Sequence, residues 1–378
     1  MDITKQQMKT LKILKEKLGN KALARSIEEA YNESGEVIGN VWEVMKRLSE
    51  EGWVKRVDDK RYTLTQNGEN VLENKKDKKH DINITFEKKQ VEEFHKLSAE
   101  RDIIKRLSGY VCPEIIGLEG EKVAALASIV SDDIVNGDNN RVFVLLSGDP
   151  GTGKSKLLVW LQENLWGFYA DKACTGPALT GGADGEQKKE GLLEKANGSI
   201  VYLDELEKME KKDQAAILNA MSRGIITINK GRVVNDEREA MIRVIAACNN
   251  EQTIIEPLRD RFDLVFQTRK LSKEEKEGFI RLKMNDFNRV KMGGEGNPDF
   301  FKNYMRYAQR FGSALPEDRE FLTEIIIEET RSGKLQGRGA RGIESIPKIA
   351  IALAKLKLKR VVGIEEVKEA IELVKEKR

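Results

Sequence analysis

The residues best suited to chemistry form one short run, Gly148-Asp149-Pro150-Gly151-Thr152-Gly153-Lys154-Ser155. It fits the pattern G-x-x-x-x-G-K-[ST], in which glycines let successive backbone N–H groups point at one anion. The lysine of this pattern contacts the β- and γ-phosphates of a nucleotide, and the hydroxyl after it holds Mg²⁺. We therefore predict a site for a nucleoside triphosphate over residues 149–156, with Lys156 as its last member and Ser155 on the metal.

The segments on either side of this loop are the strand and the helix that it needs. Residues 142–146 (Val-Phe-Val-Leu-Leu) form an apolar run typical of a buried parallel strand, and residues 156–161 are amphipathic. A helix that begins at the loop adds its dipole to the attraction for phosphate. The alternative, an ordinary glycine-rich turn, is disfavoured because the spacing and both flanks match.

A second polar pair follows another predicted strand. Residues 200–203 are apolar and lead into Asp204-Glu205. In such a pair the first carboxylate orients the Mg²⁺ shell and the second takes a proton from the attacking water. The pair therefore favours an enzyme that hydrolyses the nucleotide over a protein that only changes conformation on binding it. The alternative is an acidic strand end near solvent.

A third predicted strand, residues 244–248, ends at Asn249, whose amide can hydrogen-bond the γ-phosphate or the lytic water. Soon after it comes the run Pro257-Leu258-Arg259-Asp260-Arg261-Phe262-Asp263. An arginine supplied at a subunit interface can reach the neighbour's γ-phosphate. We favour Arg261 over Arg259 for this role, and the alternative is a surface salt bridge.

Composition limits the remaining possibilities. The 378 residues are 39% apolar and 34% charged, which suits two or three domains with cores of their own. A net charge of +3 is too small to indicate nucleic-acid binding by itself. Cys112, Cys174 and Cys248 have neither disulfide nor zinc spacing, and we find no signal peptide or membrane-spanning run. We therefore expect a cytoplasmic protein without a membrane partner.

The first 75 residues are predicted to form a winged helix-turn-helix domain. Its second and third helices are expected over residues 20–33 and 38–51, and short strands over 53–57 and 61–64. A charged linker with a helical lead-in would occupy residues 76–110, an α/β core 111–270 and a helical domain 271–378. Pro347 interrupts the helical pattern of the last domain, so we expect a kink or a late helix start there.

A winged helix suggests contact with DNA, with the third helix in a major groove and the wing on phosphates. The basic residues that would make these contacts are Lys46, Arg47, Lys55, Arg56, Lys60 and Arg61. Glu43, Glu50 and Glu51 oppose this interpretation, and a protein-docking module is the alternative.

Together these motifs resemble one family. A helical module after a phosphate-loop α/β core is the layout of an AAA+ ATPase, and the chain looks like the ATPase module of the minichromosome maintenance (MCM) helicases. The matching pieces are Pro113-Glu114-Ile115-Ile116-Gly117, residues 148–155, Leu203-Asp204-Glu205-Leu206-Glu207-Lys208-Met209, residues 246–249, Arg261-Phe262-Asp263 and Arg341-Gly342-Ile343-Glu344-Ser345.

The resemblance implies an α/β AAA+ P-loop core with a C-terminal helical lid, here preceded by the winged helix. It implies a homo-oligomeric ring, expected to be a hexamer, that hydrolyses ATP with Mg²⁺ on DNA. It also implies that Arg261 and Arg341 act in trans on a neighbour's nucleotide, with Arg331 and Arg338 as substitutes for Arg341.

Residues 224–234 alternate around a Lys-Gly turn, which predicts a β-hairpin just before the strand that ends at Asn249. In the family that the chain resembles, such a hairpin enters a central pore. The resemblance therefore implies that Lys230, with Arg232 close by, contacts single-stranded DNA. The alternative is a solvated hairpin tip.

The chain also departs from the family pattern. We find no oligonucleotide-binding tier, Gly153 stands where the family commonly has Ala, and residues 174–197 are shorter than its second pore insertion. These departures suggest a reduced MCM, such as a replication protein of a plasmid, virus or integrated element. Two other functions stay open: an ATP-gated DNA-binding initiator that does not unwind, and a protein remodeller of the MoxR or chelatase type.

Overall fold

The computed structural model divides the chain into two units, Met1–Thr85 and Phe86–Arg378. The residues that it describes are 10, 11, 13, 21–23, 27, 41–50, 54–56, 61–64, 86–115, 117–135, 138–184, 187–230, 234–270, 272, 276, 277, 280, 298–333, 335 and 340–375.

In the N-terminal unit, three antiparallel strands pair in the order β1-β3-β2 and helix α3 packs beside them. These elements are β1 (Lys21–Leu23), α3 (Val41–Glu50), β2 (Val54–Arg56) and β3 (Arg61–Leu64). The two wing strands are therefore confirmed as strands. The helix predicted over residues 20–33 is wrong at its start, because Lys21–Leu23 pairs with β3 instead. Pairing with a distant strand outweighs local helix propensity here. The winged-helix assignment itself stays a prediction.

The second unit contains a five-stranded, all-parallel sheet in the order β14-β6-β13-β10-β7. Its strands are β6 (Val144–Gly148), β7 (Phe168–Ala170), β10 (Ile200–Leu203), β13 (Arg243–Cys248) and β14 (Leu264–Thr268). Each predicted apolar run therefore forms a buried parallel strand.

Helices cover both faces of this sheet. Val144 and Leu146 of β6 pack on the side of α8 (Lys154–Asn164), whereas Leu145 packs on the side of α11 (Lys211–Arg223). Successive strand residues point to opposite faces, so two separate cores form, as in other doubly wound α/β folds. The predicted α/β core is confirmed.

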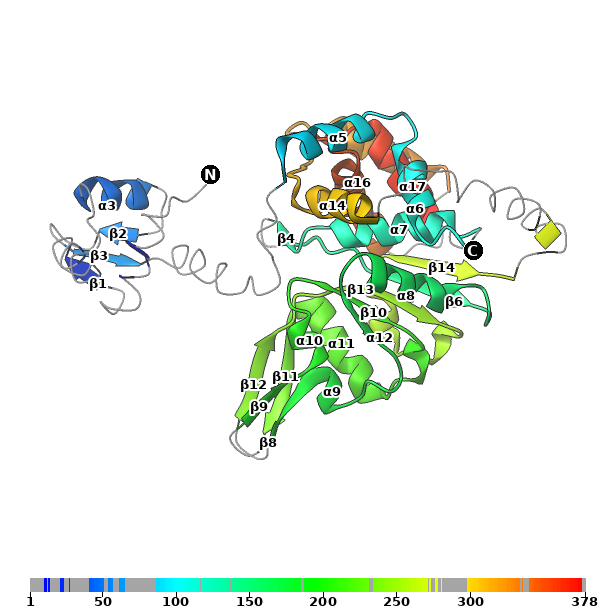
Figure 1. Cartoon of the computed structure of the whole chain (residues 1–378), viewed down its shortest axis with the longest axis horizontal. Helices are drawn as coiled ribbons and strands as arrows, with labels where there is room; N and C mark the ends of the chain where they lie inside the picture. The colour runs from blue at the N-terminus through cyan, green and yellow to red at the C-terminus, as the bar shows by residue number, and fades with distance from the viewer. Residues whose placement is uncertain are drawn as a thin grey trace. The chain divides into compact units, whose positions relative to one another are not determined.

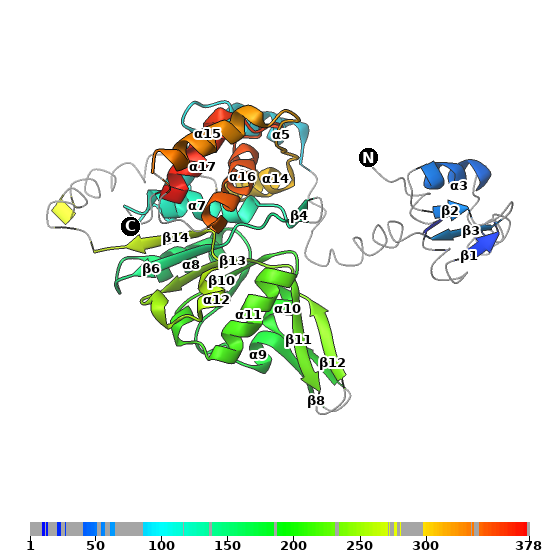
Figure 2. The ribbon, with the colours of Figure 1, turned by 180° about the vertical axis from the view of Figure 1, so that it is seen from behind.

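The C-terminal lid helices pack against the helical lead-in and the first helix of the α/β core (Figures 1 and 2). The elements are α5 (Lys88–Ser98), α6 (Ile103–Tyr110), α7 (Glu119–Val130), α14 (Pro298–Arg310), α15 (Glu320–Arg331), α16 (Ala340–Leu356) and α17 (Ile364–Lys375). The ring of Phe94 on α5 lies 5.3 Å from that of Phe300 and 5.7 Å from that of Tyr304, both on α14. Segments far apart in the chain therefore share one core.

Of the two outcomes expected at Pro347, a kink or a late helix start, the late start is wrong, and the kink stays a prediction. Helix α16 begins at Ala340 and runs through Pro347 to Leu356. Proline lacks the N–H that would bond the carbonyl one turn earlier, but the buried Ile346, Ile349 and Ala350 hold this segment against the core.

Two β-hairpins project from the end of the α/β core remote from the lid helices (Figures 1 and 2). One is β11 (Ile225–Lys230) with β12 (Val234–Glu239), which confirms the predicted hairpin. The other is β8 (Gly181–Asp184) with β9 (Gln187–Glu190), and β8 contacts β11.

The remaining short elements are β4 (Ile134–Val135), β5 (Asp138–Asn139), α9 (Pro177–Thr180), α10 (Leu192–Lys195), η1 (Leu206–Lys208), η2 (Glu251–Thr253) and α12 (Glu256–Arg259). Among the described helices none is long and apolar enough to cross a membrane.

Candidate nucleotide site

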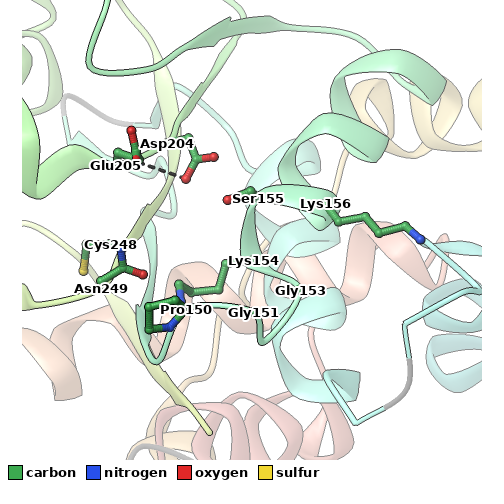
Figure 3. Close-up of a pocket in the computed structure, with 10 residues that line it drawn as sticks. All are labelled: Pro150, Gly151, Gly153, Lys154, Ser155, Lys156, Asp204, Glu205, Cys248 and Asn249. Atoms are coloured by element: carbon green, nitrogen blue, oxygen red, sulfur yellow. Dashed lines mark hydrogen bonds between the residues drawn. The ribbon is translucent and has the colours of Figure 1, made fainter. Parts of the chain in front are cut away.

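Three neighbouring strands of the sheet, β6, β13 and β10, end at the same edge because they are parallel. Ligands of open α/β sheets bind at this carboxyl edge. A cavity of about 410 Å³ opens there (Figure 3). Its lining comes from Pro150, Gly151, Gly153, Lys154, Ser155, Lys156, Asp204, Glu205, Cys248 and Asn249. The three predicted polar groups therefore meet around one space.

The loop after β6 has the backbone that a phosphate loop needs. Gly151 and Gly153 have φ values of 81° and 95°, a region that residues with a Cβ rarely adopt. At Gly148 a Cβ would collide with the carbonyl of Thr268 on β14, and at Gly153 it would lie 3.0 Å from Ile115 Cδ1. Glycine at 148 and 153 thus follows from both backbone conformation and close packing, and at 151 from backbone conformation alone.

Lys154 is held inside the loop. Its Nζ donates hydrogen bonds to the carbonyls of Gly148 at 2.7 Å and Asp149 at 2.8 Å. Burial lowers the pKa of this lysine, against the opposing attraction of nearby acidic groups that include Glu207 and Asp204. Lys154 thus places one positive charge beside the backbone dipoles of the loop, an arrangement that favours an anion.

Asp204 is buried at the end of β10 and faces the hydroxyl of Ser155 (Figure 3). Its Oδ2 accepts a hydrogen bond from the Tyr169 hydroxyl at 2.9 Å, and its Oδ1 accepts one from the Glu205 backbone at 2.9 Å. Burial and this hydrogen bond raise the pKa of Tyr169, which keeps its hydroxyl a donor. One carboxylate beside one hydroxyl suits Mg²⁺, which takes few protein ligands and completes its shell with phosphate and water. Among the described residues no cluster of three acidic, His or Cys side chains could hold a metal.

Glu205 occupies an unusual backbone position, with a φ of 51°. Its carboxylate forms ion pairs with Lys172 at 2.9 Å and with Lys208. Hydrogen bonds from Lys208 and Lys172 lower the pKa of Glu205, which keeps the carboxylate ionised and also makes it a weaker proton acceptor than a free glutamate. Sequence analysis did not anticipate either lysine.

Asn249 follows β13 and is fixed by a residue that sequence analysis missed. Its backbone N–H and its side-chain Nδ2 both donate to Oε1 of Glu207, at 3.1 and 3.0 Å. The only sequence signal was a third acid shortly after Asp204 and Glu205.

Arg261 and Arg341 lie near each other but neither lines the cavity of its own chain. Burial lowers the pKa of Arg341, and the positive charge of Arg261 lowers it further, opposed by Asp263. Among the described groups the buried Nε of Arg341 has no hydrogen-bond partner. Arg259 ends α12, Arg331 ends α15, and Arg338 lies outside the described residues.

Lys156 differs from the other loop residues. Its side chain pairs with Glu114 at the surface and points away from the cavity in Figure 3.

The predicted DNA contacts are only partly described. Lys46, Lys55, Arg56 and Arg61 are exposed on α3, β2 and β3. Lys60, Arg232 and the side chains of Arg47 and Lys230 lie outside the described part of the chain. The backbone of Lys230 ends β11, opposite Val234.

The hairpin β8–β9 was not predicted, although the dipeptide Asp184-Gly185 within residues 174–197 is a hairpin signal.

Comparison with protein families agrees with this geometry. The model of the MCM P-loop domain matches residues 90–281, and that of the MCM AAA-lid domain matches residues 299–377. The chain belongs to the MCM family. The resemblance inferred from the motifs is thereby confirmed, and this MCM chain has a nucleotide-binding P-loop domain followed by its lid.

The proteins similar to this chain include MCM-type proteins of an archaeon and a DNA replication licensing factor. An uncharacterized MCM-type protein of Methanocaldococcus jannaschii is 27% identical over 328 residues, which are 76% of this chain and 43% of that protein. A second from the same organism is 28% identical over 338 residues, 78% of this chain and 48% of that protein. The DNA replication licensing factor mcm7 of Xenopus tropicalis is 28% identical over 337 residues, 79% of this chain and 46% of that protein. The chain thus spans less than half the length of these relatives.

Proposed function

We propose that this MCM chain is a ring-forming, DNA-dependent ATPase that hydrolyses ATP to translocate on, unwind or remodel DNA in replication. The observation that carries the proposal is the meeting of Lys154, Ser155, Asp204, Glu205 and Asn249 around one cavity. These residues supply a phosphate cradle, a metal shell and a base, and hydrolysis needs all three.

In this proposal the loop from Asp149 to Lys156 binds the phosphates through backbone N–H groups and the Lys154 ammonium. Ser155 and Asp204 would hold Mg²⁺, which neutralises charge on the β- and γ-phosphates. Glu205 takes a proton from the attacking water, and Asn249 orients that water. The ionised state of Glu205, kept by Lys172 and Lys208, is the state that a base requires.

Arg261 and Arg341 are proposed to complete the site of the neighbouring subunit. Both are absent from the cavity of their own chain, and they lie close enough for one charge to lower the pKa of the other. A neighbour's γ-phosphate would receive both positive charges as negative charge develops. This arrangement requires a homo-oligomer, for which a hexamer is the expected form.

DNA is proposed to contact the hairpin β11–β12, with Lys230 and Arg232 near its tip and β8–β9 beside it. Copies around a pore would concentrate positive charge on one phosphate backbone, although the net charge of the chain is only +3. The N-terminal unit would add duplex or protein contacts through Lys46, Lys55, Arg56 and Arg61.

The first test is ATP-dependent strand displacement on a tailed DNA duplex, with Lys154→Ala as the blank. We expect displacement by the wild type alone. Hydrolysis stimulated by DNA without displacement would point instead to an initiator, and hydrolysis indifferent to DNA would point to a protein remodeller.

The action in trans has its own test. Lys154→Ala and Arg261→Ala are each expected to be inactive, and mixing them should restore part of the ATP hydrolysis. In the mixture an intact loop can meet an intact arginine from its neighbour. The matched control mixes Arg261→Ala with the double variant Lys154→Ala/Arg261→Ala, which cannot form such a site. Equal activity in both mixtures would refute the shared site.

A further inference from the structure

We propose that Glu207 is a positioning residue that turns the amide of Asn249 so that Oδ1, and not the NH₂ group, faces the reacting water. The inference rests on the proposed ATP hydrolysis and decides between the two roles that an amide at this place can have. It assigns Asn249 as an acceptor for the water rather than a donor to the γ-phosphate.

The geometry of the amide leads to this assignment. Both the backbone N–H and Nδ2 of Asn249 donate to the same oxygen, Oε1 of Glu207, at 3.1 and 3.0 Å. The two ends of an amide are difficult to tell apart by shape, so the partner must decide. A carboxylate accepts hydrogen bonds and donates none, so the atom facing Glu207 has to be the nitrogen.

The other end of the amide is thereby aimed at the cavity. In Figure 3 the Asn249 oxygen points to the side on which Pro150 and Lys154 lie. Asn249 is exposed and lines the cavity, whereas Glu207 does not line it. Glu207 therefore acts on the cavity through Asn249 and does not line it itself.

The charge of Glu207 also acts on Lys154, but the described hydrogen bonds of its carboxylate both go to Asn249. The second carboxylate oxygen of Glu207, Oε2, is buried and has no hydrogen-bond partner in the described part of the chain. The contact that the Glu207 carboxylate makes is with Asn249, 42 residues further along the chain, and it fixes the orientation of that amide.

The chemical consequence concerns the proton that Glu205 removes. A water that donates one hydrogen to Glu205 and the other to Asn249 Oδ1 has both hydrogens directed to the protein. Its lone pair is then free to face phosphorus. If the amide were turned round, its NH₂ would compete for that lone pair and oppose attack.

The test compares Glu207→Ala, Glu207→Gln and Asn249→Ala for the kcat and KM of ATP hydrolysis. Glutamine keeps an oxygen that can accept both Asn249 hydrogens, so Glu207→Gln should retain most of the wild-type kcat. Glu207→Ala should lower kcat by about 10- to 100-fold, in the range of a lost transition-state contact, with KM nearly unchanged. Glu210→Ala is the matched control, because this exposed acid on the same segment pairs with Lys212 at the surface and does not line the cavity.

The double variant Glu207→Ala/Asn249→Ala separates positioning from a general structural role. If Glu207 acts through Asn249, the double variant should be no slower than Asn249→Ala alone. Titration with a fluorescent ATP analogue checks that each variant still binds nucleotide. An unchanged kcat in Glu207→Ala, or losses that multiply in the double variant, would overturn the inference alone. A wild type without ATP turnover would overturn the proposed function and the inference with it.

Discussion

The junction between core and lid depends on a buried ion pair whose removal has a predictable cost. Lys348 on α16 places Nζ 2.7 Å from Oδ1 of Asp263, and their side chains are 13% and 0% exposed. Lys348 also donates to the carbonyl of Arg141 at 3.0 Å, and Oδ2 of Asp263 accepts the Phe143 N–H at 2.9 Å. The pair therefore ties the lid helix to the start of β6 and to the loop before β14.

We expect Lys348→Met to destabilise this unit by about 3–5 kcal/mol, because it leaves Asp263 charged and buried. Burial lowers the pKa of Lys348, although Asp263 opposes the shift. The ion pair therefore adds little folding free energy compared with two neutral groups of similar size. The double variant Lys348→Met/Asp263→Asn should consequently recover most of the loss. Asparagine can still accept the Phe143 N–H.

Thermal unfolding measures this effect. For a unit of this size each kcal/mol moves Tm by about 2–4 °C, so Lys348→Met should lower Tm by about 6–20 °C. A double-mutant cycle over Lys348 and Asp263 should give a coupling energy of about 2 kcal/mol or more. A coupling energy near zero, or a Lys348→Met protein as stable as the wild type, would refute the reasoning.

The same pair should matter for the arginines proposed to act in trans. Asp263 follows Arg261 closely in the chain, and Arg341 lies two turns before Lys348 on α16. Loosening the pair should therefore reduce activity in the mixing experiment even at temperatures where Lys348→Met remains folded.

Three further predictions concern separate parts of the chain. Glu205→Gln should keep ATP affinity and lower turnover by about 10²-fold or more, measured by nucleotide titration and steady-state hydrolysis; undiminished turnover would exclude this base. Lys230→Ala should leave basal ATP hydrolysis nearly intact and reduce its stimulation by single-stranded DNA; stimulation equal to that of the wild type would remove the hairpin from the DNA path. At the start of α17, burial opposes ionisation of Glu366, but hydrogen bonds from Lys359, Lys357 and a backbone N–H outweigh it and lower its pKa to about 2. The stability from this group should therefore be complete above its ordinary pKa of 4.5 and be lost as the pH falls towards about 2. Glu366→Gln should lower Tm at pH 7 and match the wild type near pH 2, and an equal Tm difference at both pH values would contradict this.

The sequence by itself determined the chemistry of the nucleotide site and the fold that carries it. The phosphate loop is one continuous run from Gly148 to Ser155, and Asp204, Glu205 and Asn249 each stand directly after an apolar run. Because parallel strands end at one edge of a sheet, strand ends that are distant in sequence are predictably close in space. Family resemblance added the lid and the candidates Arg261 and Arg341 without any need for coordinates.

The tertiary structure alone decided which partners complete these groups. The pairing of Lys21–Leu23 with β3 overrides a helical pattern, and α5 of the helical lead-in packs through Phe94 on α14 of the lid. Glu207 holds Asn249, and Lys348 holds Asp263, across long stretches of chain. Periodicity and motif spacing report the local conformation of the backbone. They carry no information about which polar side chain meets which, because that choice depends on packing among elements from the whole unit.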